Sequence, residues 1–185
     1  MIYVIDHEDS FTYNLAHLLD DIQPTIVSNY YEIDYKKLEK SNIIVLSPGP
    51  GEPKDYPLTT KIYNKYKGKK KIIGICLGFQ QIVYSEGGKI IQQKRILHGY
   101  QSDIKVISKK SIFKNNYKFK GGRYHSLKIS EPFKSKSLKI TMRCTKTNVA
   151  MAIEDDINQV YGFQFHPDSF LTPNGKNLIK KIISN

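Results

Sequence analysis

The residue best suited to covalent chemistry is Cys76, which lies between two glycines in residues 72–80, Ile-Ile-Gly-Ile-Cys-Leu-Gly-Phe-Gln. An apolar run precedes this cysteine and a helical pattern follows it. Such an order is typical of a nucleophile elbow, a tight strand-to-helix turn that exposes a reactive side chain. The helix N-terminus favours a thiolate, and the backbone N–H of Leu77 is free to face an oxyanion. A small buried cysteine at the end of a core strand fits the same pattern.

A cysteine that forms an acyl intermediate needs a proton carrier for the leaving group, and histidine does this best near neutral pH. Among the 5 histidines, His166 is the most suggestive, because it follows the predicted strand 161–165 and precedes Pro167. Asp168 lies two residues further on and could orient the imidazole ring. Because a lone histidine is more often structural, the residues by themselves leave the pairing of Cys76 with His166 open.

The elements that must position these side chains alternate between strands and helices in the first half of the chain. Apolar runs predict buried strands, residues at helical spacing predict helices, and Ser10 is the expected N-cap of the first helix. The predicted strands are 1–6, 25–28, 43–46 and 71–75, and the predicted helices are 11–22, 35–40, 58–66 and 78–85. We therefore expect an α/β fold, a largely parallel open sheet flanked by helices as in flavodoxin.

The second half of the chain has a different pattern, with short alternating strands and few helices. The strands predicted there are 104–107, 137–142, 149–153 and 160–165, and an amphipathic helix is predicted over 174–183. We interpret these strands as antiparallel additions to the same core. Since no repeat or long linker is visible, we expect a single domain over residues 1–185.

The composition narrows the class of protein. Hydrophobic residues make up 39% and charged residues 25% of the chain, which indicates a soluble globular protein. No apolar run approaches the roughly 18 residues of a membrane span, and no cleavable leader is visible, so we expect a cytoplasmic protein without a membrane partner. The 2 cysteines lie far apart, which argues against a disulfide framework or a structural zinc site.

The net charge of +12 raises the question of a nucleic-acid partner. However, the lysines are scattered, and the densest runs, at 67–71 and 134–139, fall in predicted loops or at element edges. No nucleic-acid-binding motif accompanies them. We therefore interpret the charge as solvated surface with a weak attraction for anions or acidic partners, and we expect no nucleic-acid partner.

Three separated stretches, 47–51, 74–80 and 162–169, resemble the signatures of the class I (triad) glutamine amidotransferases in residues, order and spacing. They read Ser-Pro-Gly-Pro-Gly, Gly-Ile-Cys-Leu-Gly-Phe-Gln and Gly-Phe-Gln-Phe-His-Pro-Asp-Ser. Within that family, Asp-Ser-Phe-Thr-Tyr-Asn at 9–14 and Arg-Tyr-His-Ser-Leu at 123–127 are similar to the small subunits of anthranilate synthase and aminodeoxychorismate synthase. The resemblance spans essentially the whole chain.

The resemblance implies roles that the residues alone do not assign. Cys76 would attack the side-chain amide of glutamine, His166 would carry the proton, and Asp168 would orient His166. The residues implied to bind glutamine or its oxyanion are Gly49, Pro50, Gly51, Leu77, Gln80, Ser126 and Leu127. The thioester left on the cysteine would then be hydrolysed to glutamate.

The chemistry that accepts ammonia has no visible counterpart in this sequence, which lacks a glycine-rich nucleotide loop and a second domain. We therefore expect amination to occur on a large subunit, which the resemblance suggests binds chorismate and Mg²⁺. This chain itself is expected to need no metal or other cofactor. The sequence leaves open whether the product is anthranilate or aminodeoxychorismate.

Two positions depart from the family pattern. Asp168 stands where the family has Glu, one methylene longer, and Tyr100 stands where it usually has Lys. The shorter carboxylate predicts a longer contact with His166, so a non-catalytic regulatory subunit on the same scaffold remains an alternative. Other rivals are a cysteine peptidase, which would ignore glutamine, and a nucleic-acid-binding protein, whose binding would depend steeply on salt.

Overall fold

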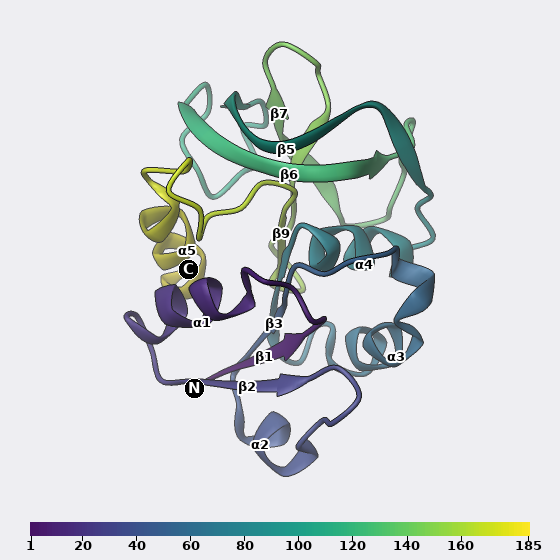
Figure 1. The fold of residues 1–185 in the computed structure, drawn as a ribbon, viewed down its shortest axis with the longest axis vertical. Coiled ribbons are helices and arrows are strands. Elements are labelled where there is room, and N and C mark those ends of the chain that lie inside the picture. Colours follow the sequence, from purple (N-terminus) through teal and green to yellow (C-terminus); the bar gives the residue numbers. More distant parts are fainter.

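The computed structural model describes all residues 1–185 and contains one nine-stranded sheet with the strand order β2-β1-β3-β4-β9-β8-β7-β5-β6 (Figure 1). Its strands are β1 (Ile2–Asp6), β2 (Thr25–Asn29), β3 (Ile43–Leu46), β4 (Lys71–Ile75), β5 (Ile90–Val106), β6 (Lys118–Ile129), β7 (Lys139–Cys144), β8 (Ala150–Asp155) and β9 (Val160–Phe163). The helices are α1 (Thr12–Asp20), α2 (Tyr35–Lys40), the short 3-10 helix η1 (Pro53–Asp55), α3 (Pro57–Tyr66), α4 (Leu77–Ser85) and α5 (Gly175–Ser184).

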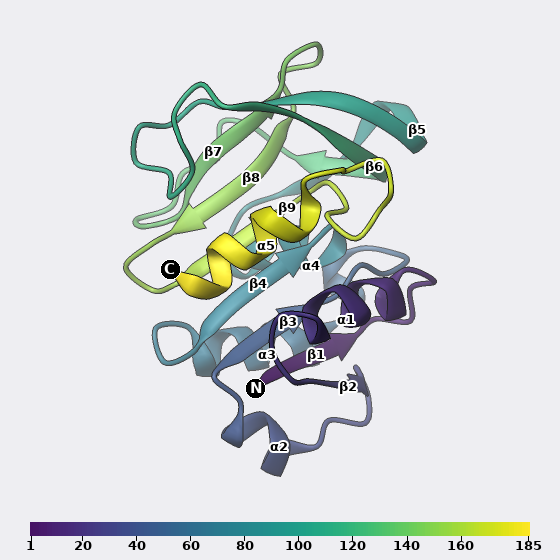
Figure 2. The same cartoon turned by 90° about the vertical axis from the view of Figure 1, so that its left-hand side faces the viewer.

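Five neighbouring strands, β2, β1, β3, β4 and β9, run parallel to one another. Their carboxyl ends therefore meet at one edge of the sheet, where open α/β sheets commonly bind ligands. The other four strands are joined by antiparallel pairs and extend the sheet beyond β9. Figure 2 shows the long β5–β6 hairpin curving over the end of the parallel part.

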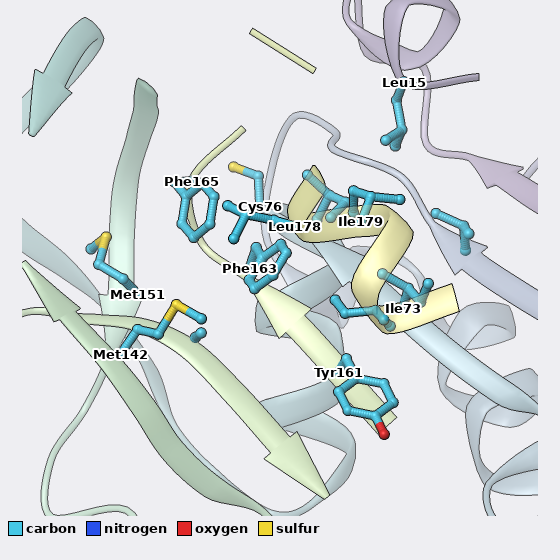
Figure 3. Packing of buried hydrophobic residues seen from close by; sticks show 14 of the residues in the cluster. Leu15, Ile73, Cys76, Met142, Met151, Tyr161, Phe163, Phe165, Leu178 and Ile179 are labelled. Carbon is cyan, nitrogen blue, oxygen red and sulfur yellow. The ribbon is translucent and has the colours of Figure 1, made fainter. Parts of the chain in front are cut away.

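Helices cover both faces of the parallel strands, and the central strands β1, β3 and β4 are buried along their whole length. One hydrophobic cluster contains residues of α1 and α5, and a second contains residues of α2, α3 and α4. In Figure 3, Leu178 and Ile179 of α5 lie over Ile73 and Phe163 of the sheet, and Cys76 lies near the same cluster. The cysteine is thus anchored on a packed core.

The predicted α/β architecture is confirmed, and most elements of the first half begin and end within two residues of their predicted limits. The N-cap prediction at Ser10 is wrong. Helix α1 begins at Thr12 after Phe11, whose backbone N–H donates to the side chain of Asp9. The Asp9 carboxylate thus stabilises the turn before the helix, and no side chain caps the helix itself.

The second half needs larger corrections. Strand β5 begins at Ile90, not at 104, and β6 falls in a stretch for which no strand is predicted. Strand β9 is also not a wholly antiparallel addition, because it pairs in parallel with β4 and antiparallel with β8. It therefore completes the parallel part of the sheet and brings His166, which follows it, to the edge where β4 ends.

Candidate active site

Cys76 lies in the turn between β4 and α4 with a backbone φ of 51° and ψ of −99°. This positive-φ conformation is strained for a residue with a side chain, and such strain is characteristic of functional turns. The turn is closed by the glycines on either side. A Cβ on Gly78 would collide with the backbone of Leu46, and one on Gly74 would collide with Gly78 itself. The flanking glycines are therefore needed for α4 to approach the sheet.

His166 is buried next to β6, where its backbone N–H donates to the carbonyl of Gly122 at 2.9 Å. Phe11 and Tyr124 pack edge-on against its ring, with centroid distances of 5.3 and 5.0 Å. These contacts limit the rotation of the imidazole. Thr172 further fixes the backbone, since its hydroxyl donates to the His166 carbonyl at 2.6 Å.

Asp168 lies beside His166, with 3.7 Å between the carboxylate Oδ1 and the ring Nδ1. Neither carboxylate oxygen and neither ring nitrogen has a hydrogen-bond partner in the protein. The two groups form an ion pair without a direct hydrogen bond, as expected for a carboxylate one methylene shorter than glutamate. An ionised carboxylate and an imidazolium stabilise each other at this distance.

The charge around His166 alters its acidity. Burial by itself lowers the pKa of His166, but negative charge on Cys76 and Asp168 outweighs burial and raises that pKa to about 10. Near neutral pH the imidazole is therefore held in its protonated form beside Cys76. An imidazolium in this position is ready to donate a proton to a leaving group.

A cavity of about 350 Å³ opens above Cys76 at the carboxyl edge of the parallel strands. Nine of the ten residues that the sequence analysis selected line this cavity: Gly49, Pro50, Gly51, Cys76, Leu77, Gln80, Ser126, Leu127 and His166. Asp168 does not line it and lies against His166. A volume of this size suits a ligand as small as an amino acid.

The loop after β3 approaches the cavity through Gly49, where a Cβ would collide with the side chains of Leu77 and His7. His7 supports this loop, because its backbone N–H donates to the Ser47 hydroxyl at 2.8 Å. The His7 ring lies 2.9 Å from the Thr59 hydroxyl, and burial lowers the pKa of His7 to about 4. A neutral His7 thus holds the loop, a role that the sequence analysis did not assign.

Strand β6 presents Ser126 and Leu127 to the cavity, and a buried network behind the strand holds them. The Arg123 Nε–H donates to His125 Nε2 at 3.0 Å, so the proton of His125 must be on Nδ1, which donates to the Leu127 carbonyl at 2.8 Å. Burial and the charge of Arg123 lower the pKa of His125 to about 3. Gln93 completes the network by donating to the His125 carbonyl at 2.7 Å.

A chain of glutamines connects the first turn of α4 to the thiol. Gln80 donates to the side-chain oxygen of Gln164 at 3.1 Å, and Gln164 Nε2 lies 3.7 Å from Cys76 Sγ. Gln164 was not among the predicted site residues, although it lies within the stretch that carries His166. Its position between strand β9 and His166 was the available signal.

The family follows from comparison with known proteins. Residues 3–185 match the family described as glutamine amidotransferase class-I. The chain belongs to the class-I glutamine amidotransferases. Anthranilate synthase component 2 of Lactococcus lactis is 37% identical to it over 188 residues, covering 100% of this chain and 94% of that relative.

A longer relative and a solved structure show the same similarity. The bifunctional protein TrpGD of Thermotoga maritima is 36% identical over 189 residues, but this chain spans only 32% of that protein. A solved glutamine amidotransferase from Thermotoga maritima has the same fold, with a TM-score of 0.77 at 14% identity, over 99% of this chain and 96% of that one. In the chain described here, no helix is long and apolar enough to cross a membrane.

Proposed function

We propose that the chain hydrolyses glutamine to glutamate at Cys76 and supplies the ammonia to a chorismate-binding synthase subunit. The proposal of glutamine hydrolysis depends on one observation. The strained Cys76 turn opens into a cavity that is also lined by a buried, protonated His166. The partner rests on the names of relatives such as anthranilate synthase component 2.

In the first half of the reaction, the Cys76 thiolate attacks the side-chain carbonyl carbon of glutamine. The backbone N–H of Leu77, at the start of α4, and the loop around Gly49 and Gly51 face the oxyanion that develops. The His166 imidazolium then donates its proton to the amide nitrogen. The carbon–nitrogen bond breaks, ammonia leaves, and a thioester remains on Cys76.

In the second half, neutral His166 takes a proton from water, and the resulting hydroxide attacks the thioester carbon. The carbon–sulfur bond breaks, glutamate leaves, and the starting pair of thiolate and imidazolium is restored. One glutamine and one water thus give one glutamate and one ammonia. Asp168 acts by stabilising the imidazolium, and no metal or cofactor on this chain takes part; Mg²⁺ is proposed only for the partner.

Binding of the amino-acid end of glutamine is proposed for Ser126 and Leu127, with Gln80 and Pro50 closing the sides of the cavity. This assignment is supported by the network that fixes β6 from behind, since a backbone that presents donors and acceptors to a substrate must be held in place. The residues that hold it are Arg123, His125 and Gln93.

The second candidate is a non-catalytic regulatory subunit, which the missing hydrogen bond between Asp168 and His166 favours. Co-purification with candidate large subunits, followed by addition of glutamine and chorismate, separates the two. We expect anthranilate or aminodeoxychorismate only when Cys76 is intact, and the product names the partner. If ammonium supports synthesis with a partner but glutamine does so with none of the partners tested, the chain is a non-catalytic regulatory subunit and this proposal is wrong.

A further inference from the structure

A second cavity, of about 360 Å³, lies among β5, β6 and the end of β7 and shares no lining residue with the cavity above Cys76. We call it the basic pocket. Its lining residues are Gln93, Lys94, Arg95, Leu97, Tyr100, Ser102, Arg123, Lys128, Cys144, Lys146, Thr147 and Val149. The pocket therefore has a volume suited to a small molecule. Its link to glutamine binding is that two of its lining residues, Arg123 and Gln93, also hold β6 from behind.

The lining of the basic pocket carries five cationic side chains and no carboxylate. None of these five cations takes part in any ion pair of the structure. The neighbouring Asp103 is outside the lining and is already paired with Lys120 at 2.7 Å. The pocket thus concentrates positive charge that the protein itself does not neutralise, and this attracts anions.

Arg123 forms the floor of the pocket and is 1% exposed. Its Nε–H donates to His125, and its Nη2 donates to Gln93 Oε1 at 3.3 Å, but its buried Nη1 has no partner. Burial of the guanidinium lowers the pKa of Arg123, as expected for a charge removed from water. An oxyanion would supply the missing acceptor and the missing negative charge together.

Cys144 is the lining group beside Arg123 that could itself become negative. Burial raises the pKa of Cys144, but hydrogen bonds from Thr147 and the charge of Arg123 outweigh burial and lower it. A single thiolate would balance only one of the five cations. A weak sulfur acceptor also leaves Nη1 without a good hydrogen bond.

We propose that the basic pocket binds a small organic oxyanion, a phosphate or carboxylate group carried on a compact apolar body. Arg123 and the Ser102 hydroxyl would hold the oxyanion at the floor, and Leu97, Tyr100 and Val149 would contact the apolar body. Lys94 and Lys146, which are exposed and line the pocket, would attract the anion, and the side chains around the buried Nη1 would have to move for the two to meet. This proposal stands independently of the function at Cys76.

The test uses Cys144 as a reporter inside the pocket. In a Cys76→Ser variant Cys144 is the only thiol, and its rate of alkylation by iodoacetamide is measured against phenyl phosphate, benzoate and inorganic phosphate. Sodium chloride at matched ionic strength is the reference. We expect a saturable slowing of roughly tenfold, the loss when about nine in ten sites are filled. The organic anion should act at lower concentration than inorganic phosphate.

A matched pair of double variants separates a site from general charge attraction. Lys94→Gln with Lys146→Gln should raise the half-saturating concentration about tenfold, since two charges at the mouth are lost. Lys61→Gln with Lys109→Gln removes the same charge from exposed positions outside the pocket and should leave it unchanged. The proposal is overturned if no anion slows alkylation more than chloride does, or if both double variants weaken the effect equally.

Discussion

The chain places its two free, buried cysteines beside nitrogen cations, Cys76 near His166 and Cys144 near Arg123, but the two regions differ in the backbone around the thiol and in the chemistry of the cation. Cys76 lies on a strained turn and lines the cavity of the candidate active site, whereas Cys144 is the last residue of strand β7 and lines the basic pocket. Near Cys76 the cation can give up its proton, whereas a guanidinium keeps it at any ordinary pH. A buried thiol is therefore suited to acyl transfer when the backbone turn exposes it to a cavity and when a group that can release a proton lies beside it.

The histidines in the two regions show the same contrast. His166 faces negative charge and has a pKa raised to about 10, while His125 is buried beside Arg123 and has a pKa lowered to about 3. At neutral pH His166 is therefore a proton donor, and His125 is a neutral residue that supports strand β6.

Replacing His166 by Asn should reduce glutamate release by roughly a thousandfold, since the leaving nitrogen loses its proton donor. The variant is assayed together with the synthase partner. His17→Asn, on the exposed side of α1, is the control and should keep full activity. Near-normal turnover in the His166 variant would assign the proton transfer to another group.

Gly78→Ala should destabilise the protein by about 3 kcal/mol, because its Cβ would meet the backbone of Leu46, which cannot move aside as a flexible side chain can. The free energy of unfolding in urea measures this. Gly87→Asn is the control, since it lies in open space and asparagine tolerates its φ of 80°. Equal stability of the two variants would show that the elbow is less tightly packed than the structure indicates.

Replacing Cys76 by Ser should lower the pKa of His166 from about 10 toward its ordinary value, because the thiolate charge is lost and only Asp168 remains. NMR titration of the imidazole provides the measurement, with His125 as an internal reference that should not move. A His166 pKa unchanged by the substitution would show that negative charge on Cys76 does not raise that pKa.

The same two histidines have opposite consequences for the stability of the fold. The His125 contribution is full above its ordinary pKa of 6.5 and is lost as the pH falls toward about 3, because the unfolded chain takes up the proton first. The His166 contribution is full below 6.5 and is lost as the pH rises toward about 10.

Asp168→Glu should keep glutaminase activity or raise it severalfold, because one more methylene can shorten the 3.7 Å separation from His166 to a hydrogen bond. Steady-state rates at saturating glutamine are compared with those of Asp168→Asn, which keeps the size of the side chain and removes its charge. A large fall with Glu would mean that the buried backbone around this residue is adapted to aspartate.

The smallest effect is expected for Cys144→Ser, which should change glutaminase activity less than about twofold. This residue does not line the cavity above Cys76, and a buried thiol-to-hydroxyl change mainly affects local packing and hydrogen bonding. Loss of turnover comparable to that of a Cys76 variant would contradict the choice of nucleophile.

The parallel part of the fold could be predicted from sequence because its strands are short apolar runs punctuated by turn residues. Thus the prediction of β4 at 71–75 is confirmed by Lys71–Ile75, and that of α2 at 35–40 by Tyr35–Lys40. The long β5–β6 hairpin could not be predicted in the same way. Strand β6 contains three lysines and two adjacent glycines and pairs over a long sequence separation, so its local pattern is weak.

In the candidate site, too, the residues of local motifs could be predicted from the sequence, and the residues that support them could not. Cys76 was selected from the turn pattern around it, and Gly49 was selected from the family resemblance of its motif. The supports of the site come from tertiary contacts: His7 reaches Thr59, and Arg123 reaches Gln93. No local pattern encodes a contact between residues so far apart, and the gap between Asp168 and His166 likewise depends on the packing around both.

The most direct test of the account is covalent labelling with a glutamine analogue that carries an electrophilic carbon in place of the side-chain amide. We predict that the label appears on Cys76 alone, that glutamine protects against it, and that turnover is lost in proportion to labelling. The Cys144→Ser variant should be labelled as fast as the unaltered protein. Label on Cys144, or full turnover by a protein fully labelled on Cys76, would contradict the assignment of Cys76 as the nucleophile.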